Sequence, residues 1–210
     1  MNINTPKIQD SLPITTFEEI FDLENPFIEN VIISDCEINL QRNELIEFKN
    51  VQFKNVTFNG TRLDKVFFKN CRFDNCDLSD THFYEASIHN VEFNKSRLIG
   101  VVLTDARMEH VLFNQCNLQL ASFGNSRQRF VRYDECILEE SDFYENDLKK
   151  MDFTNSQLSG INFTQTKLNN IDLSETHFTH LTVGIADLRG CIVNEMQAVN
   201  LANLLGLVIK

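Results

Sequence analysis

The chain has 210 residues and a formal net charge of −11 at pH 7, because 30 acidic residues outnumber 19 basic ones. This excess argues against nucleic acid or an anionic membrane as a direct partner and favours a basic one. No apolar run approaches the roughly 18 residues of a membrane span, and the first residues, MNINTPKIQD, lack the pattern of a secretory signal. We therefore expect a cytoplasmic protein with one domain.

Residues 1–25 are predicted to form an N-terminal cap that contains a short helix. Thr16-Phe17-Glu18-Glu19 has the pattern of a capping box, and Asn25-Pro26 should end the helix. Phe17, Ile20 and Phe21 would lie on one side of this helix and cover the start of the next region. A partner-binding helix is the alternative interpretation.

Residues 26–193 follow a period of five, which neither an α-helix nor an ordinary strand produces. Large apolar residues fall at numbers ending in 3 or 8, and only Asn43 and Gln128 break this rule. Smaller residues fall at numbers ending in 1 or 6, and neither column holds a charge. Because a buried unpaired charge costs several kcal/mol, we expect these two columns to point inward and the other three outward.

Such a pattern predicts a coil that turns a corner at each repeat and stacks its turns about 4.8 Å apart. CDLSD (76–80), SDFYE (141–145), MDFTN (151–155), IDLSE (171–175) and ADLRG (186–190) resemble the motif of the pentapeptide-repeat proteins. The resemblance covers residues 26–193. It implies an all-β fold, a right-handed quadrilateral β-helix with four repeats per turn.

The six cysteines all fall at numbers ending in 1 or 6, so we interpret them as buried structural thiols. Cys116 and Cys136 should lie on adjacent turns, but a reducing compartment disfavours a disulfide between them. No zinc-binding C-x-x-C spacing is present, and the five histidines fall in outward columns. We expect neither a metal nor a cofactor.

Two places are irregular although the five-residue count never breaks. Around Asn43, Leu40 and Leu45 fall in outward columns, and around Gln128, Phe130 does the same. Each is predicted to be a bulge or a deformed corner. The second would gather Arg127, Arg129 and Arg132 into a cluster that could contact a partner. An unbroken count predicts no long inserted loop.

With four repeats per turn, residues twenty apart share a side. Three sides are then acidic, and the side of Phe48, Phe68 and Leu148 is basic. The candidate partner-binding acids are Asp74, Asp77, Glu92, Asp134, Glu135, Glu139, Glu140, Asp142, Glu145, Asp152, Asp172 and Glu175. Glu92 should tolerate substitution by Lys, since it is expected to lie outward. On a rod of roughly 40 Å, the charge density would be about a third of that of duplex DNA.

Residues 194–210 leave the period and are predicted to form a helix from Asn194, with Gly206 as its stop. Its apolar residues exceed what one cap needs, which favours a two-fold contact. The candidate dimerisation residues are Met196, Val199, Leu201, Ala202, Leu204, Leu205, Leu207 and Ile209. The run DLRGCIVNEMQAVNLANLLGLVIK resembles the end of the Qnr subfamily, in which such a helix joins two rods end to end.

Catalysis is not expected, because the sequence has no G-x-S-x-G, P-loop or H-E-x-x-H motif. Qnr proteins are quinolone-resistance determinants that bind type II topoisomerases. The resemblance therefore implies a homodimer that mimics DNA and binds DNA gyrase or topoisomerase IV. It would inhibit these enzymes or protect them from quinolones. The alternative is a non-enzymatic scaffold or immunity-type protein with a different protein partner.

Overall fold

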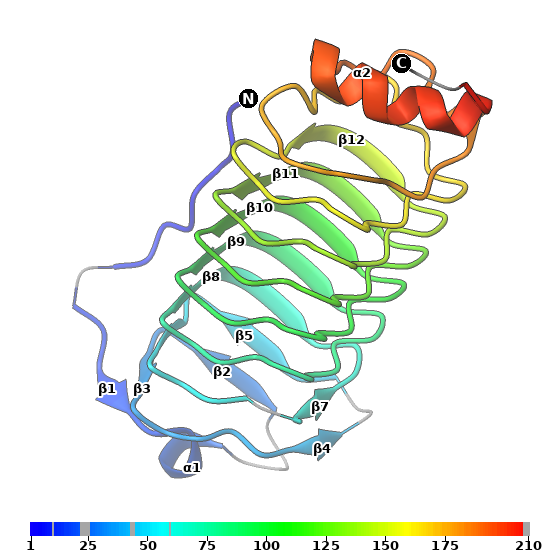
Figure 1. The fold of residues 1–210 in the computed structure, drawn as a ribbon. Helices are drawn as coiled ribbons and strands as arrows, with labels where there is room; N and C mark the ends of the chain where they lie inside the picture. Colours follow the sequence, from blue (N-terminus) through cyan, green and yellow to red (C-terminus); the bar gives the residue numbers. More distant parts are fainter. Residues whose placement is uncertain (10, 22–25, 43–44, 59, 208–210) are drawn as a thin grey trace.

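The computed structural model describes residues 1–9, 11–21, 26–42, 45–58 and 60–207. They form a rod of stacked turns, the predicted right-handed quadrilateral β-helix, with a short helix at each end (Figure 1). The strands are β1 (Ile14–Thr15), β2 (Phe27–Glu29), β3 (Ile32–Ser34), β4 (Gln41–Arg42), β5 (Glu47–Lys49), β6 (Gln52–Lys54), β7 (Arg62–Leu63), β8 (Phe67–Asp74), β9 (Ser87–Asn94), β10 (Arg107–Asn114), β11 (Arg127–Asp134) and β12 (Asp147–Asp152). The helices are α1 (Phe17–Ile20), η1 (Ile185–Leu188), α2 (Glu195–Ala202) and η2 (Asn203–Leu205).

The strands pair in parallel, and among the strands from β5 to β12 paired residues are twenty positions apart, as Phe53 and Phe73 are. One turn therefore holds four five-residue repeats, which confirms the predicted stacking. We number the sides by their residues in the turn 126–145: side one is 126–130, side two 131–135, side three 136–140 and side four 141–145. The other turns follow at intervals of twenty.

The corners of the rod are made by residues with left-handed backbone. Within the described chain, positive φ angles occur at numbers ending in 0 or 5, except at Gly206. Asn tolerates this conformation better than most residues. Asn30, Asn50, Asn70 and Asn90 stack at one corner, and each side-chain amide donates to the carbonyl oxygen of the Asn one turn earlier, at 2.9–3.2 Å. A corner every five residues closes the tube.

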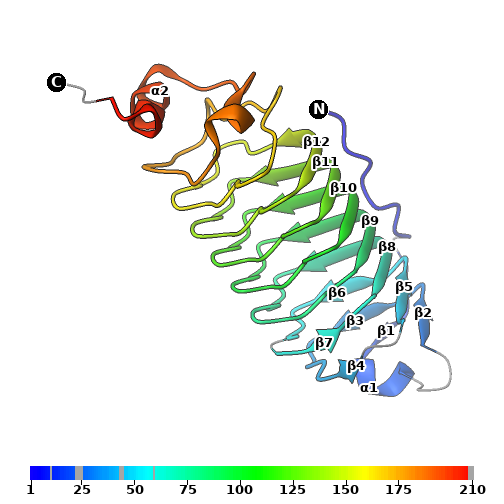
Figure 2. The same cartoon turned by 90° about the vertical axis from the view of Figure 1, so that its right-hand side faces the viewer.

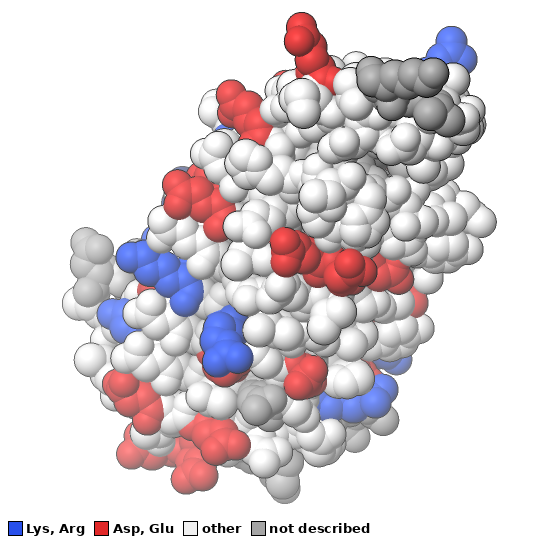
Figure 3. All heavy atoms as spheres, viewed as in Figure 1, with Lys and Arg blue, Asp and Glu red and all other residues white. Residues whose placement is uncertain are grey.

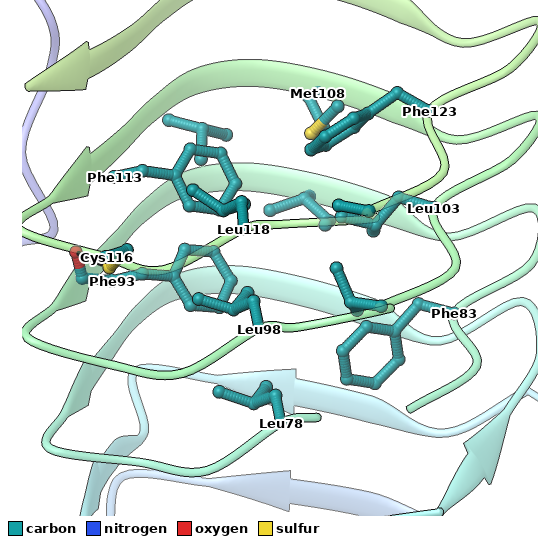
Figure 4. Close-up of a cluster of buried hydrophobic side chains, with 14 of the residues drawn as sticks. Leu78, Phe83, Phe93, Leu98, Leu103, Met108, Phe113, Cys116, Leu118 and Phe123 are labelled. Atoms are coloured by element: carbon teal, nitrogen blue, oxygen red, sulfur yellow. Dashed lines mark hydrogen bonds between the residues drawn. The ribbon is translucent and has the colours of Figure 1, made fainter. Parts of the chain in front are cut away.

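The two predicted inward columns fill the rod. Between Ile46 and Val183 all their members are buried except Leu148, which is half-buried. The aromatic rings stack from turn to turn: Phe53–Phe73 and Phe73–Phe93 have centroid separations of 4.5 and 4.6 Å. Figure 4 shows this packing around Phe93 and Phe113. Polar members of the small column donate to backbone carbonyls, as the Thr81 hydroxyl does to Phe58 at 3.0 Å.

The prediction of a deformed corner at Gln128 is wrong. Gln128 lies inside the rod on the regular strand β11, and it is fully buried. Its amide nitrogen donates to Ser126 and Asn146, each at 3.2 Å, and its oxygen accepts from the Tyr133 hydroxyl at 3.0 Å. An amide replaces an apolar residue here because these partners satisfy both of its polar atoms.

The irregularity before residue 45 is a local shift in register. Gln41 pairs with Arg62, one residue more than the usual offset, whereas Glu47 pairs with Phe67 at the offset of twenty. The shift turns Leu40 toward the core and leaves Gln41 exposed, so the column prediction is wrong at these two positions. Leu45 is exposed. Asn43 lies outside the described residues.

The helix α1 forms the expected N-terminal cap. The Thr16 amide donates to the Glu19 carboxylate at 3.0 Å, and Phe17, Ile20 and Phe21 pack on the core. The preceding segment was not expected. Residues 1–9 lie along the flank of the rod, and the N-terminus is near the C-terminal end of the rod, beside β12 (Figures 1 and 2). The Asn4 amide donates to His110 Nδ1 at 3.3 Å, and the Met1 carbonyl accepts from Arg132 at 3.1 Å.

Candidate functional site

The predicted acidic residues do not form one patch, because they occupy three sides of the rod. Asp74, Glu92, Asp134, Glu135, Asp152, Asp172 and Glu175 belong to side two, Asp77, Glu139 and Glu140 to side three, and Asp142 and Glu145 to side four. Some of these residues nevertheless lie at the same height along the rod. Figure 3 shows a row of acidic side chains crossing the rod on the side that faces the viewer.

The densest group of acids makes a ring around the rod, which we call the acidic band: Asp134, Glu135, Glu139, Glu140, Asp142, Glu145 and Asp147. These residues span most of one turn, so they face outward in several directions at one height. Three of them, Glu135, Glu140 and Glu145, are exposed residues at successive corners with positive φ. Negative charge at this level is therefore accessible from more than one side.

Three acids of the band are held by neutral partners on neighbouring turns, among them the corner residue Glu135, which accepts from the Gln115 amide at 2.8 Å. Glu139 accepts from the Gln119 amide at 3.0 Å, and Asp142 accepts from the Asn162 amide at 2.8 Å. These bonds orient the carboxylates without neutralising them. Asp147, in contrast, is paired with Arg129 at 2.7 Å.

Glu92 is not the exposed outward residue that the sequence predicts. It lies on the outer surface of β9 but is only 8% exposed, and it pairs with Arg72 at 3.0 Å. Substitution by Lys would place two cations together at a buried position, so it should destabilise the rod. Asp152 is likewise paired, with Arg132 at 2.9 Å. Neither carboxylate offers unpaired charge to a partner.

Asp172 is an exposed member of the predicted set near the C-terminal end of the rod. The Ser174 hydroxyl donates to its carboxylate at 2.6 Å and the Ser174 amide at 2.9 Å. Both bonds favour the ionised form and lower the pKa of Asp172, the hydroxyl bond contributing more. This residue therefore keeps its negative charge in mildly acidic solution.

The predicted arginine cluster is divided by a corner. Arg127 and Arg129 lie on side one, whereas Arg132 lies on side two, beyond the left-handed residue Phe130. Phe130 stacks on His110, with a centroid separation of 4.7 Å. Arg129 and Arg132 are both ion-paired, and Arg127 is exposed. The three side chains do not form a single contact surface.

The C-terminal helix begins where predicted. Asn194 Oδ1 accepts from the Gln197 amide, and Gln197 Oε1 accepts from the Asn194 amide, both at 2.9 Å. Gln197 is buried, and its side-chain nitrogen donates to the carbonyls of Leu173 and Thr176 at 2.7 and 2.9 Å. The helix thus satisfies carbonyls at the open end of the rod.

The predicted dimerisation residues differ in exposure. Met196, Val199, Leu204, Leu205 and Leu207 are exposed, the first of them by 74%. Leu201 and Ala202 are partly buried, and with Leu188 they line an apolar cavity of about 360 Å³ between α2 and η1. Ile209 lies outside the described residues. The outer surface of α2 is therefore apolar and uncovered.

The cysteines are free thiols, four of them buried: Cys71, Cys76, Cys116 and Cys136. Burial raises the pKa of Cys71 and of Cys76 to about 12, and it raises the pKa of Cys136 still further. The part of the chain that the structure describes contains no group of His, Cys, Asp and Glu side chains arranged to hold a metal ion. Nor does it contain a helix of the length and apolarity that crossing a membrane requires.

Comparison with known proteins gives one family match. A family model described as a pentapeptide repeat region matches residues 66–129 and 126–202. Among solved structures, a trypsin-treated variant of QnrB1, a plasmid-mediated fluoroquinolone resistance protein, is 20% identical, covers 88% of this chain and 91% of its own, and has a TM-score of 0.45. HetL, a pentapeptide repeat protein involved in heterocyst differentiation regulation in Nostoc sp. strain PCC 7120, is 13% identical with coverages of 80% and 85% and a TM-score of 0.26. No curated protein matches the chain.

Proposed function

Because the chain belongs to the pentapeptide-repeat family, we propose that it acts as a non-enzymatic binding protein in the cytoplasm. Its partner would be a type II topoisomerase, DNA gyrase or topoisomerase IV. The rod would occupy the basic surface that holds duplex DNA, and it would inhibit the enzyme or protect it from quinolones. The main support is the acidic band, which presents negative charge on several sides of a straight rod.

Two features favour a type II topoisomerase over other basic proteins as the partner. The C-terminal sequence resembles that of the Qnr subfamily, and the surface of α2 is apolar and uncovered. Two rods joined there would form a longer acidic column with two-fold symmetry, which fits a partner that is itself symmetric. The imitation of DNA would depend on the shape of the rod and on acidic side chains that face several directions, since the charge density of the rod is lower than that of DNA.

Gyrase supercoiling, measured with and without a fluoroquinolone, tests this proposal. The informative variant carries Glu135→Gln, Glu140→Gln and Glu145→Gln, which remove three exposed charges from the acidic band. Its matched control carries Glu18→Gln, Glu37→Gln and Glu195→Gln, which remove three exposed charges elsewhere. We expect the first variant to lose about tenfold in potency and the control to change by less than about twofold.

The wild-type protein must first inhibit gyrase or protect it at micromolar concentration. If it does neither, the topoisomerase proposal fails, and capture from a lysate should then identify the partner of a different scaffold or immunity-type protein. Equal losses in the two variants would mean that overall charge, rather than the acidic band, governs the interaction.

A further inference from the structure

The parallel ladder of the rod is interrupted after β12 on two of its four sides. On sides three and four the turns continue to pair: Leu158 donates to the His177 carbonyl at 2.8 Å, and Phe163 donates to Thr182 at 2.7 Å. On sides one and two, the described backbone of residues 147–155 makes no ladder bond to residues 167–175, and β12 is the last strand drawn (Figure 1). The turns on either side of this gap are therefore joined on two sides and open on the other two. Beyond the gap the ladder resumes, because Leu168 donates to the Asp187 carbonyl at 2.9 Å and Leu173 to the Ile192 carbonyl at 2.8 Å.

The opening is a cleft that lies against the free edge of β12. On side one it is a cavity of about 780 Å³ bounded by β12 and by residues 165–171. Leu148 lies in it, and this residue is only partly buried, whereas the other members of the inward columns between Ile46 and Val183 are buried. On side two a second cavity, of about 370 Å³, lies between the same two turns, and Met1, Met151 and Asp152 help to line it. An unpaired strand edge with an accessible apolar side chain can accept another strand.

The residues that line the side-one cleft carry a net positive charge, whereas the whole molecule is negative. Its lining includes the exposed Lys149, Lys150 and Lys167, together with Arg129. Asp147 pairs with Arg129 at 2.7 Å and lies 4.0 Å from Lys149. Glu145 is the other lining acid, so cations outnumber acids in a protein whose net charge is −11. Charge complementarity selects an acidic occupant.

We propose that the free edge of β12 is a binding site for an extended acidic segment of a partner protein, which adds to the ladder as a further strand. Its backbone would bond to the unpaired edge of residues 147–152. A small apolar side chain would cover Leu148, and its carboxylates would meet Lys149, Lys150 and Lys167. This site adjoins the acidic band, whose Glu145 and Asp147 help to line it, but its lysines call for a segment of opposite charge to the partner of the band.

A labelled synthetic peptide of about eight residues, in which Glu alternates with Val, serves as the probe. Fluorescence anisotropy with the full-length protein measures its affinity. The variant Lys149→Glu, Lys150→Glu, Lys167→Glu should weaken binding by at least about tenfold. The matched control, Lys65→Glu, Lys69→Glu, Lys95→Glu, makes the same charge change at exposed positions elsewhere and should change affinity by less than about twofold.

A second pair of measurements separates strand addition from simple charge attraction. The same peptide with alternate backbone amides N-methylated keeps every carboxylate but cannot pair, and it should not bind. Hydrogen exchange should show the amides of residues 147–152 exchanging faster than those of 127–134 in the free protein, and slowing when the probe binds.

Several results would overturn the proposal. One is the absence of probe binding at millimolar peptide, and another is equal binding of the N-methylated peptide. Equally tight binding of an oligothymidylate would indicate a general anion surface. Equal protection of residues 147–152 and 127–134 in the free protein would mean that the cleft is closed in solution.

Discussion

At the scale of single residues, the rod depends on what each inward side chain meets one turn above and one turn below. Phe73 lies between Phe53 and Phe93, with ring separations of 4.5 and 4.6 Å. This position is fully buried. Tolerance to substitution should therefore change abruptly between neighbouring positions of one repeat.

Phe73→Asp should lower the free energy of unfolding by several kcal/mol, because it buries an unpaired charge in the ring stack. The matched control, Asn75→Asp, adds the same charge at an exposed corner two residues later. We expect it to change stability by less than about 0.5 kcal/mol. Urea denaturation followed by circular dichroism measures both, and equal stability of the two variants would contradict the inward assignment.

The buried polar side chains around Gln128 lead to a second prediction about stability. Gln128→Leu restores the apolar residue that the period favours, but it leaves the Tyr133 hydroxyl without its acceptor. We expect a loss of about 1–3 kcal/mol, the usual cost of a buried unsatisfied polar group. Adding Tyr133→Phe should recover part of this loss, and denaturation of the two single variants and the double variant measures it. Additive losses would show that the two residues do not depend on each other.

The cysteines should differ in reactivity with their burial. Thiolates are the reactive form, and a pKa of about 12 leaves very little thiolate on Cys71 and Cys76 at pH 8. In the native protein we expect the partly exposed Cys36 to be alkylated by iodoacetamide well before these two. Peptide mapping after timed alkylation checks the order. Prior unfolding in urea is the control, since it should make all six cysteines react.

At the scale of elements, α2 both closes the rod and presents an apolar surface. Its inner surface is fixed by Gln197, whose side chain bonds to carbonyls of the last turns. Met196 on its outer surface and Leu205 at the end of η2 are 74% and 59% exposed. Closing the rod does not use these two side chains, so their contact with a second copy remains our proposal.

Met196→Glu combined with Leu205→Glu should convert a dimer to monomers without unfolding the rod, because both positions are exposed. Light scattering coupled to size-exclusion chromatography measures the mass. Leu120→Glu is the matched control, since Leu120 is 62% exposed at a corner far from α2 along the chain. Dimers of the double variant, or monomers of the wild-type protein, would refute this interface.

At the scale of the whole molecule, charge is arranged by side and by height along the rod. The acidic band and the lysines of the cleft lie close together at the level of β12. The rod can therefore offer a basic partner one surface and an acidic segment another. Both interactions depend on exposed charges, which salt screens effectively.

Binding to gyrase should weaken as salt rises from 0.1 to 0.5 M, mainly through a slower association rate. Surface plasmon resonance at several salt concentrations measures this rate. The variant Glu135→Gln, Glu140→Gln, Glu145→Gln should show a shallower salt dependence than the wild-type protein. The same slope for both would place the contact away from the acidic band.

The amino-acid sequence by itself determined the inside of this protein. In a stack of near-identical turns, burial depends on position within the repeat, so the period of five predicts the inward columns and the parallel ladder. The helix-start patterns at Thr16 and Asn194 predict the two end helices. The repeat also holds a second signal, in the residue types at its corners. Asn, Asp and Gly recur at numbers ending in 0 or 5, where the chain needs left-handed backbone.

Only the tertiary structure decided the outside and the exceptions. Whether Glu92 is exposed depends on Arg72 one turn away, and Gln128 is acceptable inside because Ser126, Tyr133 and Asn146 converge on it. The five-residue pattern predicts neither the course of residues 1–9 nor the cleft beside β12. They arise from contacts between distant segments and from how the last turns stack, and a local pattern carries no information about either.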